Sequence, residues 1–272
     1  MAINYASKYA GQIDEKFKLA SMTTPAVNDN FDFTGVNTVN VYAVSTAPMN
    51  DYSMTGNTRY GVAAELGNST QALVLSKDRS FTFTIDRRNY LDTQMVMEAG
   101  KSLTRQIEEV VAPEIDVYRL AKIAEGAKNS ATLAITKANA YASFLDAQAA
   151  LTDEKAPLPG RLVYCTPAYY KFLKQDDTFV KASDIAQNML LKGQLGMVDG
   201  VPVIVVPTAY LPEDTAFVLT NPIACCSPIK LADYKIHDNP PGINGWLVEG
   251  RLYYDAFVLN NKKGAIYTHK IA

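Results

Sequence analysis

The sequence predicts an α+β fold, because long alternating strands, one long amphipathic helix and a segment of short helices and strands follow one another. Residues 79–86 alternate strictly between apolar and polar side chains, which is the pattern of a half-buried strand. The apolar face of that strand is Phe81, Phe83 and Ile85. Hydrophobic residues make up 48% of the chain and charged residues 20%, which indicates a globular protein with a substantial core.

The N-terminal stretch of residues 1–30 mixes charged and aromatic side chains. Tyr9, Ile13 and Phe17 fall at helical spacing, which predicts a short helix with little of its own chain to pack on. Two interpretations remain open: a frayed terminus, or an arm that becomes ordered only against a neighbouring subunit.

A long excursion follows this stretch. Residues 36–44 have strand character, residues 45–66 are rich in turn formers with little to bury, and apolar residues return at 73–75. The alternating strand at residues 79–86 is expected to be the return strand, and together these segments predict a long two-stranded excursion with a mobile tip. A lone two-stranded hairpin is only marginally stable in water, so we expect it to need a partner surface, most economically a neighbouring copy.

The long helix is predicted over residues 91–125, where apolar side chains recur in steps of three or four. Pro113 should kink or split this helix, and Gly126 should end it. Lys101 lies in a Gly-Lys-Ser run, but Met95 stands where a phosphate-binding loop needs glycine, so a nucleotide site is not expected. The solvent face is predicted to carry the charged residues Lys101, Arg105, Glu108, Glu109, Arg119 and Lys122.

The segment after this helix alternates short helices with short apolar strands, which predicts a mixed α/β unit. The predicted helices are 138–151, 168–174 and 184–192, and the predicted strands are 161–165, 201–207 and 216–219. The chain then closes with aromatic strands over 246–259 and 265–269, joined by a polar turn at 260–264. We expect these last strands to form a hairpin that packs on the long helix.

Candidate chemistry is sparse. The net charge of −2 argues against tight binding to nucleic acid, and no apolar run is long enough to cross a membrane. Cys165, Cys225 and Cys226 have apolar neighbours and are predicted to be reduced and buried, while His237 and His269 are predicted to be structural. No zinc-site spacing or nucleophile elbow occurs, so the sequence predicts no catalytic residue, no metal and no cofactor.

Several stretches carry a resemblance to one family: FTFTIDRRN at 81–89, the helix around Glu108 and Glu109, GMVDGVPVIV at 196–205, and the closing strands. In order and local pattern, nearly the whole chain resembles the major capsid proteins of tailed bacteriophages. Their fold is of the Hong Kong ninety-seven type and is shared with encapsulins. The likeness lies in the order of parts, since no single motif is diagnostic.

The resemblance implies a division of the chain. Residues 1–30 would be the N-arm and 31–89 an extended β-hairpin called the E-loop. Residues 90–126, with the long spine helix, and 236–272 would form the peripheral domain, and 127–235 an α/β axial domain. Such a protein is a structural subunit without enzymatic activity. It self-assembles into pentamers and hexamers of an icosahedral phage head that encloses double-stranded DNA without binding it specifically.

The resemblance also implies partners. The protein would assemble in the cytoplasm of a bacterial host, with a separate scaffolding protein and a portal, and would reside in the virion capsid. The E-loop would contact a neighbouring subunit, with Tyr52, Arg59, Tyr60 and Glu65 as candidate contacts. No lysine lies between positions 18 and 77, so the lysine–asparagine weld of some relatives is not expected. An encapsulin-type nanocompartment shell is the near alternative and a soluble α/β enzyme the remote one.

Overall fold

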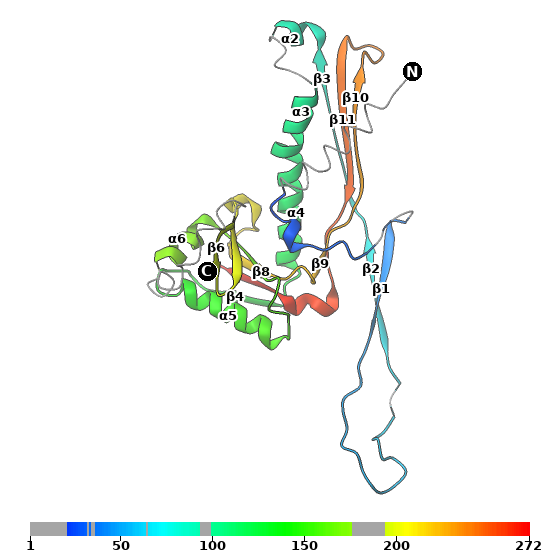
Figure 1. Ribbon diagram of the computed structural model, residues 1–272, viewed down its shortest axis with the longest axis vertical. Coiled ribbons are helices and arrows are strands. Elements are labelled where there is room, and N and C mark those ends of the chain that lie inside the picture. The colour runs from blue at the N-terminus through cyan, green and yellow to red at the C-terminus, as the bar shows by residue number, and fades with distance from the viewer. Residues whose placement is uncertain (1–20, 32, 34–35, 64, 93–98, 176–193) are drawn as a thin grey trace.

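The computed structural model describes residues 21–31, 33, 36–63, 65–92, 99–175 and 194–272. Figure 1 shows three parts: a compact body, an upright layer made of the long helix and a long sheet, and a hairpin that extends away from both. The helices predicted within residues 1–20 and 184–192 lie outside the described residues.

The compact body is built on a sheet of six described strands in the order β4-β13-β8-β5-β7-β6. Its strands are β4 (Asn129–Thr132), β13 (Ile266–Lys270), β8 (Thr215–Thr220), β5 (Leu162–Cys165), β7 (Val201–Val205) and β6 (Gln194–Val198). Helices α5 (Ala140–Asp153) and α6 (Pro167–Gln175) pack on one face through Phe144 and Leu173, and a short 3₁₀ helix, η5 (Thr208–Tyr210), follows β7. The predicted strands and helices of this segment that lie within the described residues are confirmed.

The opposite face of this sheet is covered by the C-terminal half of the long helix. Val163 points toward α5 and α6, whereas its neighbour Tyr164 packs with Leu120 and Ile123 of the long helix. Successive residues of a strand face opposite ways, so a strand with every residue buried must lie between two layers. The body is therefore a sheet with helices on both sides.

A short helix, α2 (Arg87–Asp92), follows β3, and the long helix runs unbroken from Ala99 to Glu125. That run consists of α3 (Ala99–Gln106), a π-helical segment η2 (Ile107–Val111) and α4 (Ala112–Glu125). Pro113 was expected to kink or split the helix. The helix instead continues through the wider π-helical turn. Pro113 has no backbone N–H to donate to the carbonyl of Glu109, and the π-helical segment lies at this point.

Gly126 ends the helix as predicted, although its backbone is not left-handed. A side chain at this position would collide with Val258 of β12 (Phe257–Val258), which pairs with β9 (Cys225–Cys226). Glycine is required here because this strand approaches closely, and not because the backbone adopts a conformation that favours glycine.

The upright layer pairs the long helix with a three-stranded antiparallel sheet in the order β10-β11-β3. Its strands are β10 (Ile229–Asp238), β11 (Gly245–Tyr254) and β3 (Lys77–Asp86). The predicted alternation in β3 is confirmed, because Phe81 and Phe83 pack toward Leu103 and Ile107 of the helix, Ile85 is buried, and the polar residues face outward.

The predicted closing hairpin is wrong. Residues 246–254 pair with β3 and β10, whereas β13 leaves for the six-stranded sheet, where it pairs with β4 and β8. The turn between them is a 3₁₀ helix, η6 (Asn260–Ala265), that carries the chain from one sheet to the other. Strand β10 was not predicted, because a bulge at Ile229 and Leu231 breaks its period of two.

The excursion is a hairpin of β1 (Thr38–Val44) and β2 (Asn68–Val74), so two strands are confirmed, but the prediction of residues 79–86 as the return strand is wrong. The strand that follows, β3, does not pair with it and belongs to the upright layer. Before the hairpin, a short 3₁₀ helix, η1 (Thr24–Ala26), lies against the body, where Ala26 is buried beside Leu120.

Candidate functional site

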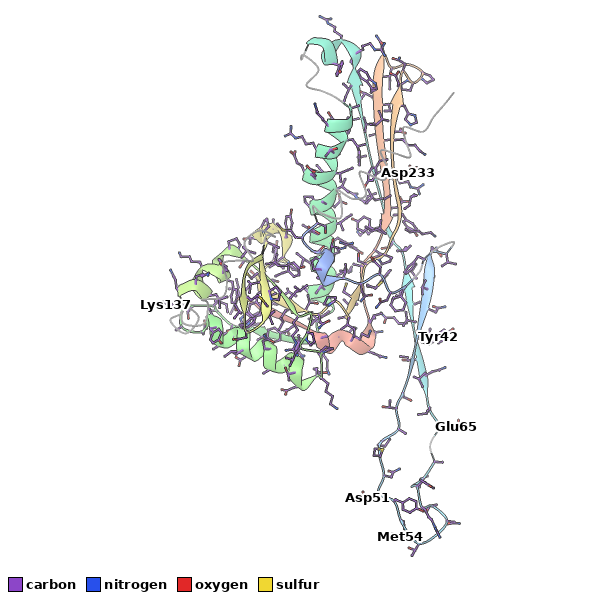
Figure 2. All side chains as sticks on the ribbon, in the orientation of Figure 1. Tyr42, Asp51, Met54, Glu65, Lys137 and Asp233 are labelled. Atoms are coloured by element: carbon purple, nitrogen blue, oxygen red, sulfur yellow. The ribbon has the colours of Figure 1, made fainter. Side chains whose placement is uncertain are left out.

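The hairpin exposes large apolar side chains along its whole length (Figure 2). Met49 is 98% exposed and Tyr60 is 85% exposed. The other exposed large apolar residues of the hairpin and its loop are Tyr42, Val44, Tyr52, Met54, Val62, Leu66 and Val74. Exposed apolar side chains in one patch indicate a surface that a partner covers.

The loop between β1 and β2 is held in shape by contacts of its own. The rings of Tyr52 and Tyr60 meet edge to face with centroids 5.1 Å apart. The backbone N–H of Ser53 donates to the carbonyl of Arg59 over 3.0 Å, and Nε of Arg59 donates to the carbonyl of Gly56 over 3.1 Å. Gly56 has a φ of +88°, a conformation that favours glycine at this turn.

The four predicted contact residues therefore divide into two groups. Tyr52, Arg59 and Tyr60 come together near the tip, where the two tyrosine rings touch. Glu65 lies on the returning limb, away from the tip (Figure 2). The tip thus presents two aromatic rings and one guanidinium group as a unit.

The base of the hairpin is fixed to its own chain by a small apolar cluster. Phe33, Leu73, Leu75 and Leu259 are its buried members. The amide of Gln71 reinforces it, because Nε2 donates to the carbonyl of residue 258 over 2.9 Å and Oε1 accepts from the N–H of residue 260 over 2.9 Å. The direction in which the hairpin leaves the molecule is set by these contacts.

A buried carboxylate, Asp255, ties the hairpin to the long helix. Its Oδ2 accepts from the N–H and from Oγ of Ser76, both over 2.8 Å, just where β2 passes into β3. Its Oδ1 accepts from the hydroxyl of Tyr118 over 2.6 Å and from the N–H of Ala256 over 2.8 Å. Burial first, and then the bond to Asp255, raises the pKa of Tyr118, so this phenol stays a donor.

The chain before the hairpin is fixed by a second buried carboxylate, Asp116 of α4, which is 2% exposed. Oδ1 accepts from Oγ of Ser21 over 2.6 Å and from Oγ1 of Thr23 over 2.5 Å, and Oδ2 accepts from the N–H of Met22 over 2.9 Å. The hydroxyl of Tyr164 donates to the carbonyl of Met22 over 3.0 Å. These bonds seat residues 21–23 on the body of their own chain.

Arg119, one turn along α4, is 4% exposed, so its predicted place on the solvent face is wrong. Its Nε donates to Oγ of Ser227 over 2.8 Å, and burial lowers its pKa while Asp116 opposes that shift. The expectation that a neighbouring subunit alone orders the N-terminal stretch is likewise wrong for residues 21–30. Residues 1–20 lie outside the described residues.

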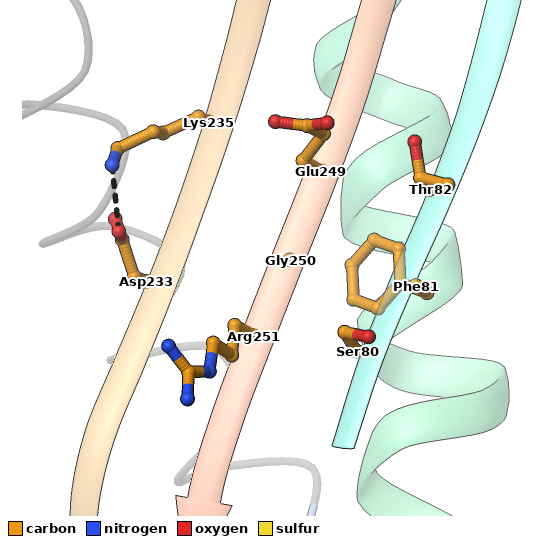
Figure 3. Close-up of a pocket in the computed structure, with 8 residues that line it drawn as sticks. All are labelled: Ser80, Phe81, Thr82, Asp233, Lys235, Glu249, Gly250 and Arg251. Carbon is orange, nitrogen blue, oxygen red and sulfur yellow. Dashed lines mark ion pairs between the residues drawn. The ribbon is translucent and has the colours of Figure 1, made fainter. Parts of the chain in front are cut away.

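A polar hollow of about 360 Å³ lies on the outer face of the three-stranded sheet (Figure 3). Its charges are paired within the sheet: Lys235 with Asp233 over 2.8 Å, and Arg251 with Asp78 over 2.6 Å. Its floor is Gly250, where any side chain would collide with the rings of Phe81 and Tyr234. Paired charges on a solvated sheet face give little to recognise a ligand, so we assign this hollow a structural role.

Of the titratable candidates from the sequence, His269 and the three cysteines are buried, whereas His237 is exposed beside Glu249. His269 is buried, stacks on Phe217 and has Nε2 3.1 Å from the carbonyl of Leu133. The three cysteines are buried as predicted, and burial raises the pKa of Cys165 to about 12. Among the described residues, no cluster of three metal-binding side chains occurs and no helix is long and apolar enough to span a membrane.

Comparison with known families decides the identity. Residues 67–268 match the family described as phage capsid protein, which is well over half of the chain. This chain belongs to the phage capsid protein family. It is a structural, non-enzymatic capsid protein that assembles into an oligomeric virion capsid, and a soluble α/β enzyme is excluded.

Solved structures support the same fold for this capsid protein. A chain from Mycobacterium phage Che8 is 15% identical with a TM-score of 0.69, and the match covers 92% of this chain and 90% of that one. The head of Helicobacter pylori bacteriophage KHP40 gives 12% identity, a TM-score of 0.68, and coverage of 93% and 90%. A virus-like particle from Pyrococcus furiosus gives 13% identity, a TM-score of 0.60, and coverage of 98% and 100%.

These identities are low, so the structural matches establish the fold, which is the phage capsid fold of the Hong Kong ninety-seven type. No curated protein matches the sequence. The family match does not favour the encapsulin alternative.

The capsid protein's three buried polar anchors, Asp116, Arg119 and Asp255, were not recognised from the sequence. A signal was present for two of them. Leu120 and Ile123 face the six-stranded sheet while Ile115 faces the three-stranded one, so α4 is apolar on two sides. A helix that is apolar on two sides leaves little solvent face for polar residues.

Proposed function

We propose that this capsid protein forms the pentamers and hexamers of an icosahedral phage head, and that its hairpin is the E-loop, which lies across a neighbouring subunit. The supporting observation is the run of exposed apolar side chains on a hairpin whose base is well anchored. Burial of such surface against a partner would contribute about 25 cal/mol of stabilising free energy per Å² of apolar area. A neighbouring copy would cover that surface.

The contact residues proposed for this interface are Tyr52, Arg59, Tyr60 and Glu65. Single exposed ion pairs contribute only about 0.2–1 kcal/mol, so buried aromatic area would supply most of the binding. Cohesion would be non-covalent, since the loop offers Arg59 and no lysine. Mature particles boiled in detergent should then run as one band near 29.8 kDa, and a ladder that survives reducing agent would contradict this.

The test of assembly is negative-stain electron microscopy of the purified protein. We expect closed shells, or rings of five and six subunits. A strictly monomeric protein at micromolar concentration, alone and with its phage partners, would refute the proposal. A variant in which Tyr52 and Tyr60 are both serine should assemble poorly.

The domain division proposed from the resemblance is an N-arm over 1–30, an E-loop over 31–89, a peripheral domain over 90–126 and 236–272, and an axial domain over 127–235. Strand pairing supports one refinement. We assign β10 to the peripheral part because it pairs with β11, and β13 to the axial part because it pairs with β4 and β8.

Further partners are proposed from the family alone. A separate scaffolding protein would set the size of the shell, a portal would occupy one vertex, and assembly would take place in the host cytoplasm. The head would enclose double-stranded DNA without binding it tightly, in keeping with a net charge of −2. Expression of this chain alone should give sheets, tubes or mis-sized shells; uniform heads from this chain alone would show that no scaffold is needed.

A further inference from the structure

A groove of about 150 Å³ opens beside the π-helical segment, between the long helix and β3. Its apolar lining includes Phe81, Val110, Val111, Leu252 and Tyr254. A cavity of about 150 Å³ with apolar walls is large enough to accept one six-membered aromatic ring. The groove is therefore the size of a single aromatic side chain.

The mouth of the groove is left uncovered by its own chain. Val110 is 47% exposed there. On the rim, Nε of Arg79 donates to Oε1 of Glu114 over 2.7 Å, and Oε2 of the same carboxylate has no partner among the described residues. The rim thus offers one carboxylate oxygen to a cation beside an apolar slot.

The tip of the hairpin carries the complementary pair of groups. Tyr60 is the most exposed aromatic residue in the described part of the chain, and Arg59 directly precedes it in the sequence. No ion pair involves Arg59 among the described residues, and its Nε donates to the carbonyl of Gly56. An aromatic ring beside an arginine is the composition that dominates binding energy at protein interfaces.

The tip cannot reach the groove of its own molecule. Figure 1 shows the hairpin leaving the molecule at the end opposite α3, so the loop around residue 60 points away from the long helix. The base of the hairpin is fixed in this direction by Asp255 and by the apolar cluster around Leu73. Only the hairpin of another copy can approach the groove.

We propose that the ring of Tyr60 from a second copy occupies this groove, and that its Arg59 pairs with the free oxygen of Glu114. This inference rests on the proposed function, because it specifies where the hairpin of one subunit docks on the next. It adds a specific pocket at the π-helical turn and assigns a docking role to Val110 and Glu114.

Engineered disulfides in assembled particles test the docking position. Tyr60→Cys is combined with Gln106→Cys on the rim of the groove, or with Lys235→Cys in the polar hollow as the matched control. The native cysteines are buried, so a mild oxidant should give little background crosslinking. We expect a ladder of linked chains on a non-reducing gel for the Gln106 pair and a single monomer band for the Lys235 pair.

The outcomes separate the two proposals. Intact particles that crosslink through Lys235, or through neither position, would overturn the docking site and leave the assembly proposal standing. Failure of the unmodified chain to assemble under any condition would overturn both.

A second measurement covers the case in which the cysteine variants fail to assemble. Tyr60→Phe keeps the ring and should leave the urea midpoint for particle dissociation unchanged. Tyr60→Ala, and Val110→Trp, which fills the groove, should each lower that midpoint. A midpoint for Tyr60→Ala equal to that of the unmodified particle would overturn the docking site.

Discussion

Replacement of Asp116 by asparagine tests how the N-terminal stretch is held. The carboxylate accepts from two hydroxyls through Oδ1 and from the N–H of Met22 through Oδ2. An amide has only one acceptor oxygen, so its NH₂ group would face a donor, and the guanidinium of Arg119 would stay buried without its counter-charge. Leaving a buried charge without its counter-charge in this way costs about 3–5 kcal/mol.

This loss is measurable on free subunits by urea unfolding followed by circular dichroism. With a denaturant dependence of about 1–3 kcal/mol per M, the midpoint should fall by roughly 1 M or more. Limited proteolysis should also cleave near Met22 sooner than in the unmodified protein, because residues 21–23 lose their anchor.

The control is Glu109→Gln, which removes an exposed carboxylate that pairs with Arg105 one turn away on the same helix. Such a pair contributes only about 0.3–0.5 kcal/mol, so this variant should unfold almost like the original. If Asp116→Asn lies within about 1 kcal/mol of the unmodified protein, the polar cluster is not what holds this segment.

Two further predictions concern packing and pH. In thermal melts, Gly250→Ala should cost about 1–3 kcal/mol of unfolding free energy, because the new Cβ would overlap the ring of Phe81. The control Gly67→Ala has no neighbouring atom closer than 3.7 Å and should be nearly neutral. Equal losses of stability in the two variants would contradict the clash. Burial raises the pKa of Cys165 and of Tyr254 to about 12 each, so the unfolded chain loses these protons first. The stability these two groups provide is complete below about pH 9 and is lost as the pH rises toward 12. Urea midpoints in reducing buffer should therefore fall between pH 8 and pH 10.5, and a flat profile would refute this linkage.

The sequence was sufficient where a local period reflects a local environment. Phe81, Phe83 and Ile85 alternate because one face of β3 packs on the long helix, and this is visible without knowing the partner. The same holds for β5, whose continuous apolar run indicated a strand buried on both faces.

The sequence was insufficient where the partner decides the structure. Nothing local shows that β11 pairs with β3 and β10 while β13 pairs with β8, since both strands are equally aromatic and separated by a polar turn. The burial of Arg119 fails for a related reason. An arginine on a helix usually faces solvent, but here the helix lies between two sheets, and this arrangement appears only when distant strands are assembled.

The two ends of the hairpin have opposite relations to their own chain, and this bears on how a shell subunit can select its neighbours. The base is held by Asp255 and by buried apolar contacts, so its direction is a property of the isolated subunit. The tip is held in shape by the Tyr52–Tyr60 contact yet leaves both rings exposed. A binding group that is already shaped and aimed loses little conformational entropy on docking, so more of its burial appears as affinity. If the tip docks as proposed, weakening the base should reduce assembly even though no base residue touches the neighbour. Asp255→Asn should then raise the protein concentration needed for particles to form. Faster hydrogen exchange of the hairpin backbone would show that the base has been weakened. If such a variant assembles like the unmodified protein, a fixed direction of the hairpin is not required for assembly.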